Sequence, residues 1–486
     1  MSLRAFHGTG GFDIVVVGGG VAGAAAAIRA AELGLSVAVA ERGQLGGAGL
    51  GAGCTPAKTL LYSASVGRII SRVHLFGFTL KSFKSNLDLI VRRAGLVAGQ
   101  LRADMEADLR ERGVRLYSGT GKLIGGGKVE VSSGGTVHIL SARTVIVAAG
   151  SRPRRLESLP VDGRNIWDYG MALAPKRLPS SLAIIGAGAI GMEFAGFYSA
   201  MGTRVSVVDK DRWILGGEDH EVSEFCQRSR EAAGTRFYMG AEVAEYRDGA
   251  LGVRLTLAST AGSTQTLRAD KVLVAVGMEA NLEGLGLENT KARVAKGRIM
   301  TDKWGRTADP HVYAIGDVAA RPWLAHKAIA EAVACVEHIA RAPSAQPVRY
   351  ENMPSLTYSE PKVGSVGLSQ EEAARGKIPL VIGRADFKRG VRSVIAADAE
   401  GFVKLMFNAK TLRLVGMAAV GSGVGEVLAA GVAALAANAT LADMERMVFA
   451  YPSYAESLSA AVRDARTRLT GVKASATAKS VKLLPN

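Results

Sequence analysis

Cysteine is scarce in this sequence, with only three residues among 486: Cys54, Cys226 and Cys335. They are odd in number and widely spaced, and no two form a CxxC pair. This pattern excludes a disulfide-stapled scaffold and favours a reducing compartment. The polar stretch 1–12 also lacks the basic and then apolar pattern of a signal peptide. We therefore expect a cytoplasmic protein.

Proline and aromatic residues are few, and basic residues outnumber acidic ones. The 14 prolines exclude a proline-rich linker protein. Lys and Arg total 60 against 44 for Asp and Glu, which gives a formal net charge of +16. Aromatic residues make up 6% of the chain and are not interleaved with basic residues in a nucleic-acid-binding motif. We interpret the charge as solvated surface and expect no nucleic-acid partner.

Apolar runs that could cross a bilayer are lacking too. Stretches 13–40 and 180–202 approach the roughly 20 residues that a span needs. Each divides, however, into a β-branched run, a glycine-rich turn and an alanine-rich run, which is typical of a buried parallel strand followed by a packed helix. We expect folded core there and no membrane span. No cluster of His, Cys, Asp and Glu has metal-ligand spacing, so we expect no metal.

Glycine is in excess, with 59 residues, and it marks an internal repeat within these two stretches. The first copy contains a strand at 14–17, the glycines Gly18, Gly20 and Gly23, and the acid Glu41. The second copy contains a strand at 182–185, the glycines Gly186, Gly188 and Gly191, and the acid Asp209. In each copy the acid lies 18 residues beyond the last glycine. The glycines allow a tight turn and close approach to a pyrophosphate at a helix N-terminus, and the acid can bind ribose hydroxyls. The repeat predicts two dinucleotide-binding sites.

The rest of the chain divides into two kinds of pattern. Strands that end on glycine follow the repeats at 144–150 and 271–277, and glycine-punctuated alternation at 118–138 predicts a small antiparallel meander. Beyond residue 348 we expect strands such as 402–407, followed by helices at 423–437 and from Tyr454. The Lys-, Ala- and Ser-rich stretch from Thr470 is interpreted as a solvated tail.

The segment 46–58, GGAGLGAGCTPAK, resembles the redox-active segment GGTCxNxGCxPSK of the pyridine nucleotide–disulfide oxidoreductases. Further family motifs follow in the family's order at 184–193, 314–318, 324–328 and 354–361. The resemblance covers about residues 12 to 462, and the chain is most similar to the dihydrolipoamide dehydrogenase branch.

The resemblance implies an α/β fold with two Rossmann-like three-layer dinucleotide-binding domains and an α+β C-terminal dimerisation domain. The implied divisions are an FAD-binding domain at 1–160 and 281–347, an NAD(P)H-binding domain at 161–280, an interface domain at 348–469 and a basic tail at 470–486. It also implies a homodimer whose active site is shared between subunits, and FAD and NAD(P)H as cofactors.

The resemblance further implies which residues bind the cofactors. For FAD they are Gly18, Gly20, Gly23, Glu41, Gly47, Lys58, Gly121, Ala149, Gly150, Ser151, Asp317, Trp323, Leu324, Ala325 and His326. For the nicotinamide nucleotide they are Gly186, Gly188, Gly191, Glu193, Asp209, Val243 and Gly277. Lys58 and Glu193 match the family's ion pair beside flavin N5, where a cation stabilises the reduced flavin.

The identity of the nicotinamide nucleotide depends on the residues at the end of the second copy. Asp209 favours NADH, because a carboxylate accepts a hydrogen bond from a free 2′-hydroxyl and repels a 2′-phosphate. Lys210 and Arg212 could accept that phosphate instead, or could be solvated loop charges. We favour NADH.

Two positions depart from the family pattern. Gly49 stands where the family has its first redox cysteine, so a CxxxxC disulfide with Cys54 is not expected. Tyr451 stands where the family has its catalytic histidine, while the accompanying Glu456 is kept. Because the reference pKa of Tyr is about 10, a tyrosine is a poor general base at neutral pH. Lipoamide chemistry is therefore not expected.

Cys54 admits two interpretations. The start of a helix and the charge of Lys58 are expected to lower the pKa of its thiol, which would give a thiolate against the flavin. Alternatively, Cys54 is a vestigial small residue. We interpret Cys226 and Cys335 as residues without a redox role.

Three functions follow from these observations. The first is an FAD enzyme that takes hydride from NADH and reduces a small non-disulfide acceptor such as a quinone directly, as a diaphorase does, at a site shaped by Phe449, Tyr451 and Tyr454. The second keeps Cys54 active, as a dihydrolipoamide dehydrogenase or a single-cysteine thiol or peroxide reductase. The third is a non-catalytic FAD-bound redox sensor. We favour the first and assign catalytic roles to Cys54, Lys58, Glu193, Tyr451 and Glu456.

Overall fold

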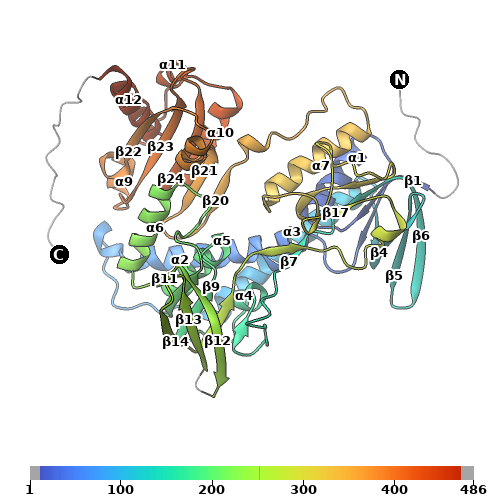
Figure 1. Ribbon diagram of the computed structural model, residues 1–486, viewed down its shortest axis with the longest axis horizontal. Coiled ribbons are helices and arrows are strands. Elements are labelled where there is room, and N and C mark those ends of the chain that lie inside the picture. The colour runs from blue at the N-terminus through green and yellow to red at the C-terminus, as the bar shows by residue number, and fades with distance from the viewer. Residues whose placement is uncertain (1–10, 251, 472–486) are drawn as a thin grey trace. The chain divides into compact units, whose positions relative to one another are not determined.

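The computed structural model describes residues 11–250 and 252–471, which form two compact units (Figure 1). Unit one contains the chain up to Arg212 and the stretch Gly234–Arg349, and unit two contains Trp213–Ala233 and the chain from Tyr350. Within the described residues, no helix is both long and apolar enough to cross a membrane. The tail from Thr470 lies mostly outside the described residues.

The first sheet of unit one has seven strands in the order β3-β2-β1-β6-β5-β4, with β19 paired to β6. Its strands are β1 (Gly11–Val17), β2 (Val37–Glu41), β3 (Arg115–Ser118), β4 (Thr120–Gly125), β5 (Lys128–Ser133), β6 (Thr136–Val147) and β19 (Val312–Ala314). Strands β3, β2, β1, β6 and β19 are parallel, while β4, β5 and the start of β6 form the expected antiparallel meander.

Strand β1 is buried on both of its faces. Ile14 and Val16 pack into one core with the helices α1 (Val21–Glu32) and α7 (Ala325–Ile339), and Val15 and Val17 pack into a second core beneath the meander. A β-branched run suits such a strand because neither face meets water.

The second sheet of unit one repeats this arrangement. Its parallel order β11-β10-β9-β15-β8 corresponds to β3-β2-β1-β6-β19 in the first sheet. Its strands are β8 (Ile166–Trp167), β9 (Ser181–Ile185), β10 (Arg204–Asp209), β11 (Arg236–Met239) and β15 (Lys271–Val274). A separate antiparallel sheet contains β12 (Ala241–Gly249), β13 (Gly252–Ser259) and β14 (Thr264–Ala269). The two Rossmann-like folds are confirmed.

The remaining elements of unit one are short strands and helices around the sheets. The helices are α2 (Cys54–Ser71), α3 (Leu87–Glu111), α4 (Tyr169–Leu173) and α5 (Ala189–Ala200), with a π-helical turn at Ala48–Ala52 and 3-10 turns at Val73–Phe76, Leu287–Asn289 and Gly316–Val318. The strands are β7 (Ser151–Pro153), β16 (Met278–Ala280), β17 (Val294–Ala295) and β18 (Arg298–Ile299). Helix α2 packs against both α5 and α4, which brings its first turn next to the second sheet's helices.

Unit two contains an antiparallel sheet in the order β20-β21-β24-β23-β22. Its strands are β20 (Ser355–Thr357), β21 (Val363–Gly367), β22 (Leu380–Asp386), β23 (Gly401–Asn408) and β24 (Leu414–Gly421). Its helices are α6 (His220–Ala232), α8 (Gln370–Arg375), α9 (Val391–Ile395), α10 (Val424–Ala436), α11 (Leu441–Glu445) and α12 (Glu456–Thr470), with 3-10 turns at Tyr350–Asn352 and Phe387–Arg389. The expected α+β character of the C-terminal part is confirmed, although the last helix begins at Glu456 rather than at Tyr454.

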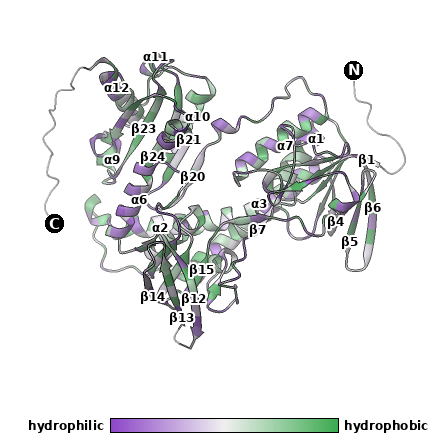
Figure 2. Cartoon of the chain, in the orientation of Figure 1, coloured by the Kyte–Doolittle hydropathy of each residue, from purple (hydrophilic) through white to green (hydrophobic). Residues whose placement is uncertain are grey.

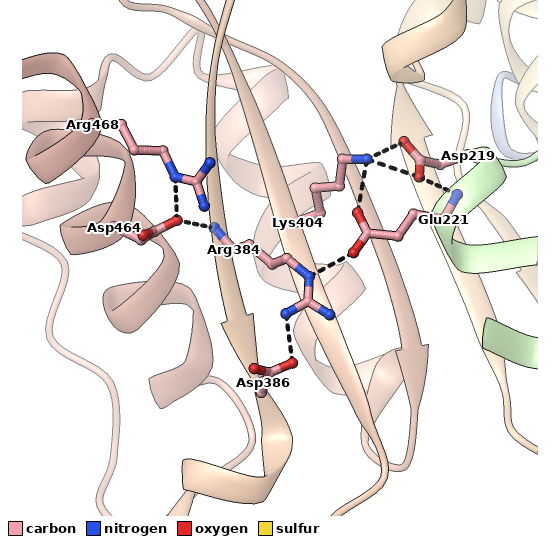
Figure 3. Close-up of polar contacts among 7 residues, drawn as sticks. All are labelled: Asp219, Glu221, Arg384, Asp386, Lys404, Asp464 and Arg468. Atoms are coloured by element: carbon pink, nitrogen blue, oxygen red, sulfur yellow. Dashed lines mark hydrogen bonds and ion pairs between the residues drawn. The ribbon is translucent and has the colours of Figure 1, made fainter. Parts of the chain in front are cut away.

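Helix α6 is mostly hydrophilic, as Figure 2 shows, yet it packs against β24. Its buried side includes Val222 and Cys226, and its first turn also joins an ionic network that we call the Lys404 cluster (Figure 3). Its members are Asp219, Glu221, Arg384, Asp386 and Lys404. Lys404 Nζ lies 2.9 Å from Asp219 Oδ2 and 3.2 Å from Glu221 Oε2, and the side chain of Asp219 is fully buried.

Candidate active site

The two glycine-rich loops connect β1 to α1 and β9 to α5. A Cβ atom at Gly23 would lie 1.8 Å from the carbonyl oxygen of Gly18, and one at Gly191 would lie 1.9 Å from that of Gly186. No larger residue fits at either position, so both helices begin close against their strands. Neither helix has a side-chain cap, which leaves its first N–H groups available to a phosphate.

The acids at the ends of β2 and β10 hold the two loops in the same way. Glu41 Oε2 accepts a hydrogen bond from the N–H of Gly19 at 2.6 Å, and Asp209 Oδ2 accepts one from the N–H of Ala187 at 2.6 Å. The second oxygen of each acid accepts from the amide two residues further along the chain. Each acid therefore lies beside its glycine loop, where a ribose can reach it.

A cavity of about 360 Å³ opens at the carboxyl edge of the first sheet. It is lined by the following residues expected to bind FAD: Gly18, Gly20, Glu41, Gly47, Gly121, Ala149, Gly150, Ser151, Asp317, Trp323 and Ala325. Gly23, Lys58, Leu324 and His326 do not line it. At Gly18, where φ is +108°, a Cβ atom would come within 2.4 Å of the oxygen of Ala148. A glycine-lined cradle with a ribose-binding acid at its side fits the ADP half of FAD.

Other lining residues were not anticipated from the sequence. They include Val21, Arg42, Tyr169, Arg152, Asn281 and Glu283. Asn281 Nδ2 donates a hydrogen bond to the oxygen of Ala149 at 2.8 Å, and the side chain of Arg152 holds the pKa of Glu283 down at about 2. Asn281 and Glu283 closely follow the predicted strand that ends at Gly277. Their position after this strand is the only feature of the sequence that points to a place at the cavity.

Asp317 is fixed at the edge of the cavity from two directions. The hydroxyl of Ser151 donates to Asp317 Oδ2 at 2.6 Å. The preceding residue, Gly316, donates its N–H to Glu331 Oε2 at 2.7 Å, and the fully buried Lys327 forms an ion pair with Glu331 at 3.2 Å. The carboxylate of Asp317 is therefore held in place before a ligand binds.

Lys58 and Glu193 meet next to this cavity, although they are far apart in the chain. Lys58 Nζ on α2 lies 2.8 Å from Glu193 Oε2 on α5, and the side chain of Glu193 is buried. This is the pairing expected from the resemblance. Lys58 follows Cys54 by four residues, about one turn of α2, so the ion pair lies close to the start of this helix.

Cys54 lines the cavity, and the pKa of its thiol is shifted in the direction opposite to the expected one. Desolvation raises the pKa of the Cys54 thiol, and the carboxylates of Glu193 and Asp317 act in the same direction. Lys58 lowers it, but by less than desolvation raises it. The expected low pKa of the Cys54 thiol is therefore wrong: although the residue is exposed, its surroundings favour the protonated thiol.

No second thiol is available to Cys54 among the described residues. All three cysteines are free, and Cys226 and Cys335 are buried, with burial raising the pKa of both thiols. A Cβ atom at Gly49 would lie 2.5 Å from Cγ1 of Val21, so a cysteine at this position would require a local rearrangement.

Tyr451 and Glu456 belong to unit two. The side chain of Tyr451 is 72% exposed, and Glu456 Oε2 accepts a hydrogen bond from the N–H of Ser453 at 3.0 Å. Tyr454 packs edge-on against Phe387, and Phe449 packs against the same core. Glu456 thus fixes the turn after Tyr451. Within the described residues, no group of His, Cys, Asp and Glu could hold a metal ion.

Comparison with known proteins places these features in one family. Residues 12–332 match the model described as pyridine nucleotide-disulphide oxidoreductase, and residues 353–462 match the dimerisation domain of the same family. A dihydrolipoyl dehydrogenase of Zymomonas mobilis is 37% identical over 454 residues, which cover 93% of this chain and 97% of the relative. A dihydrolipoyl dehydrogenase of Rhizobium etli is 34% identical and covers 94% of this chain and 98% of the relative.

A solved structure agrees with these relatives. LpdA from Mycobacterium tuberculosis superposes with a TM-score of 0.86 at 27% identity, covering 93% of this chain and 98% of that one. The chain therefore belongs to the pyridine nucleotide–disulfide oxidoreductase family, as an FAD-dependent enzyme of the dihydrolipoyl dehydrogenase type whose cofactors are FAD and NAD(H).

Proposed function

We propose that this enzyme oxidises NADH and reduces a small acceptor that is not a disulfide, such as a quinone, without using a protein thiol pair. The observation that carries the proposal is the state of Cys54. Its thiol has no second cysteine to pair with among the described residues, and its raised pKa disfavours the thiolate. When bound, FAD supplies a two-electron store that accepts hydride.

In this proposal the chain's own residues bind and orient the two cofactors. Gly18 and Glu41 support the phosphates and ribose of FAD, and Gly186 and Asp209 do the same for NADH. Lys58, oriented by Glu193, places a positive charge where the flavin gains negative charge. These roles are supported by the matched geometry of the two loops and by the ion pair.

We also propose that the enzyme acts as a homodimer. The match of residues 353–462 to a dimerisation domain supports this. Phe449, Tyr451 and Tyr454 of one subunit would then shape the acceptor site of the other, and the high exposure of Tyr451 supports a role at an interface. We also propose the division into an FAD-binding domain, an NAD(H)-binding domain and an interface domain at the boundaries given above, with the difference that Trp213–Ala233 group with the C-terminal unit. The unpaired cysteines support a reducing compartment.

The number of NADH equivalents that bleach the flavin tests the proposal. Under anaerobic conditions we expect one equivalent to bleach the FAD-loaded protein fully, in the wild type and in Cys54→Ser alike, because no dithiol stores a second pair of electrons. Both proteins should then reduce 1,4-benzoquinone much faster than free FAD does. A requirement for two equivalents, or quinone turnover no faster than that of free FAD, would refute the proposal.

A second candidate is the reaction that names the relatives. The 37% and 34% identities to two dihydrolipoyl dehydrogenases and the retention of Cys54, Lys58 and Glu193 favour it. In that case the wild type should oxidise dihydrolipoamide with NAD⁺, and Cys54→Ser should abolish this activity. The same pair of proteins therefore separates the two candidates.

The preference for NADH can be tested at Asp209. We expect Asp209→Asn to lower kcat/KM for NADH about 10-fold, because a charge-assisted hydrogen bond worth roughly 1.5 kcal/mol is weakened. The same change should raise kcat/KM for NADPH, since a 2′-phosphate no longer meets a carboxylate. Steady-state kinetics with both nucleotides check this, and Lys176→Ala, at an exposed site, is the control. A wild type that prefers NADPH would contradict the assignment.

A further inference from the structure

Tyr169 occupies a place in the cavity that neither the sequence nor the family motifs single out. It is the first residue of α4, and its side chain lines the same cavity as Cys54 and Asp317. Asp168 caps this helix by accepting the N–H of Met171 at 3.0 Å. The cap and the packing of α4 against α2 fix the backbone of Tyr169 at the cavity wall.

The hydroxyl of Tyr169 is uncommitted. No residue in the described ranges 11–250 and 252–471 exchanges a hydrogen bond with it. Tyr198 on the neighbouring helix α5 shows the contrast, because it is fully buried and its hydroxyl donates to the oxygen of Ala172 at 2.8 Å. A half-buried phenol normally uses its hydroxyl, so an unused one facing a cavity is available to a ligand.

The surroundings of Tyr169 keep its hydroxyl protonated. Burial raises the pKa of Tyr169, and the carboxylates of Asp168 and Asp317 act in the same direction. The group is therefore a proton donor and not a base throughout the neutral pH range.

We propose that Tyr169 donates a proton to the electron acceptor and that this acceptor is a quinone. The proposal rests on the direct reduction proposed above. Converting a quinone to a hydroquinone requires one hydride, which the reduced flavin supplies, and one further proton. The O–H bond of Tyr169 breaks, a new O–H bond forms on the quinone oxygen, and the tyrosinate recovers its proton from water.

The chemistry of the two groups suits this transfer. The hydroxyl formed on a reduced quinone is a phenolic hydroxyl. Proton donor and product therefore have similar pKa values, and the proton transfer has a free-energy change near zero. Among the residues that line the cavity near the start of α2, Cys54 carries the other acidic hydrogen, and its thiol is also held protonated. Replacing Cys54 and Tyr169 one at a time distinguishes proton donation by the thiol from proton donation by the phenol.

The test compares acceptors that do and do not require a proton. We expect Tyr169→Phe to lower kcat with 1,4-benzoquinone about 100-fold, the usual size of a general-acid effect. Turnover with ferricyanide, which takes electrons alone, and anaerobic bleaching of the flavin by NADH should both stay within about twofold of the wild type. Tyr62→Phe, at an exposed tyrosine of α2, is the control and should change none of the three.

Two further measurements support the assignment, and the first of them does not depend on turnover. The tyrosinate absorbance of the FAD-free wild type is titrated, and that of Tyr169→Phe is subtracted; the difference should contain one phenol that ionises above the usual value of about 10. Tyr169→His should regain part of the benzoquinone activity below pH 6.5, where an imidazolium can donate.

Several outcomes would overturn the inference. It fails if Tyr169→Phe reduces benzoquinone as fast as the wild type, or if it slows ferricyanide reduction or flavin bleaching equally, since the ring would then serve the nucleotide or the fold. If the wild type itself reduces benzoquinone no faster than free FAD, the proposed function fails as well. The two failures are thus distinguishable.

Discussion

Replacing Lys404 with methionine is expected to destabilise unit two by about 3–5 kcal/mol, the usual cost of leaving a buried charge without its partner. Lys404 is 3% exposed, and its ammonium group contacts both oxygens of the fully buried Asp219. Methionine fills a similar volume but cannot compensate the carboxylate. Glu221 loses less, because Arg384 still donates to it at 2.7 Å (Figure 3).

Hydrogen exchange of α6 and β23 measures this effect as a local opening free energy, which suits a protein of more than one unit. Lys410→Met, at an exposed lysine that follows the same strand, should change exchange by no more than about 0.5 kcal/mol. Adding Asp219→Asn to Lys404→Met should restore part of the stability, since the buried charge is removed with its partner. Protection of α6 that is unchanged in Lys404→Met would contradict the assignment.

Replacing Lys58 with methionine is expected to slow flavin reduction by NADH about 100-fold or more. The ammonium group lies 2.8 Å from the buried carboxylate of Glu193, so its loss removes the positive charge and leaves a negative one next to the flavin site. A preorganised charge at a reacting centre is worth about 10²–10³ in rate. Stopped-flow absorbance of the flavin measures the step directly.

Two controls separate the electrostatic role of Lys58 from general damage. Glu193→Gln keeps the cation and should cause a smaller loss, together with a higher flavin reduction potential. Lys84→Met, at an exposed lysine, should leave the rate unchanged. An unchanged rate in Lys58→Met, at full flavin content, would show that the ion pair only joins α2 to α5.

The sequence predicts the two nucleotide-binding sheets because their causes are local. A β-branched run, three spaced glycines and an acid 18 residues later specify a strand, a turn, a helix and a second strand within about thirty residues. The same local pattern places Glu41 and Asp209 beside their loops, where each accepts an amide hydrogen bond at 2.6 Å.

What the sequence does not predict depends on residues that are distant in the chain. The pKa of Cys54 is misjudged from its helix and Lys58 alone, since it is raised first by desolvation and then by the carboxylates of Glu193 and Asp317, which come from other elements. Tyr169 gives no signal at all, because a single tyrosine after a short strand matches no pattern. The pairing of Lys58 with Glu193 follows from the family resemblance and not from spacing.

The composition of unit two limits how this protein can be divided or recombined. Helix α6 lies within the stretch matched by the nucleotide-binding family model, yet it folds with the strands that follow residue 350. Phe225 packs edge-on against Phe402, and Cys226 is fully buried in the same unit. A gene fragment that ends at residue 349 would carry α6 without its packing partners and expose this apolar face. Exchanging the C-terminal half with that of a relative would therefore require α6 to be exchanged with it.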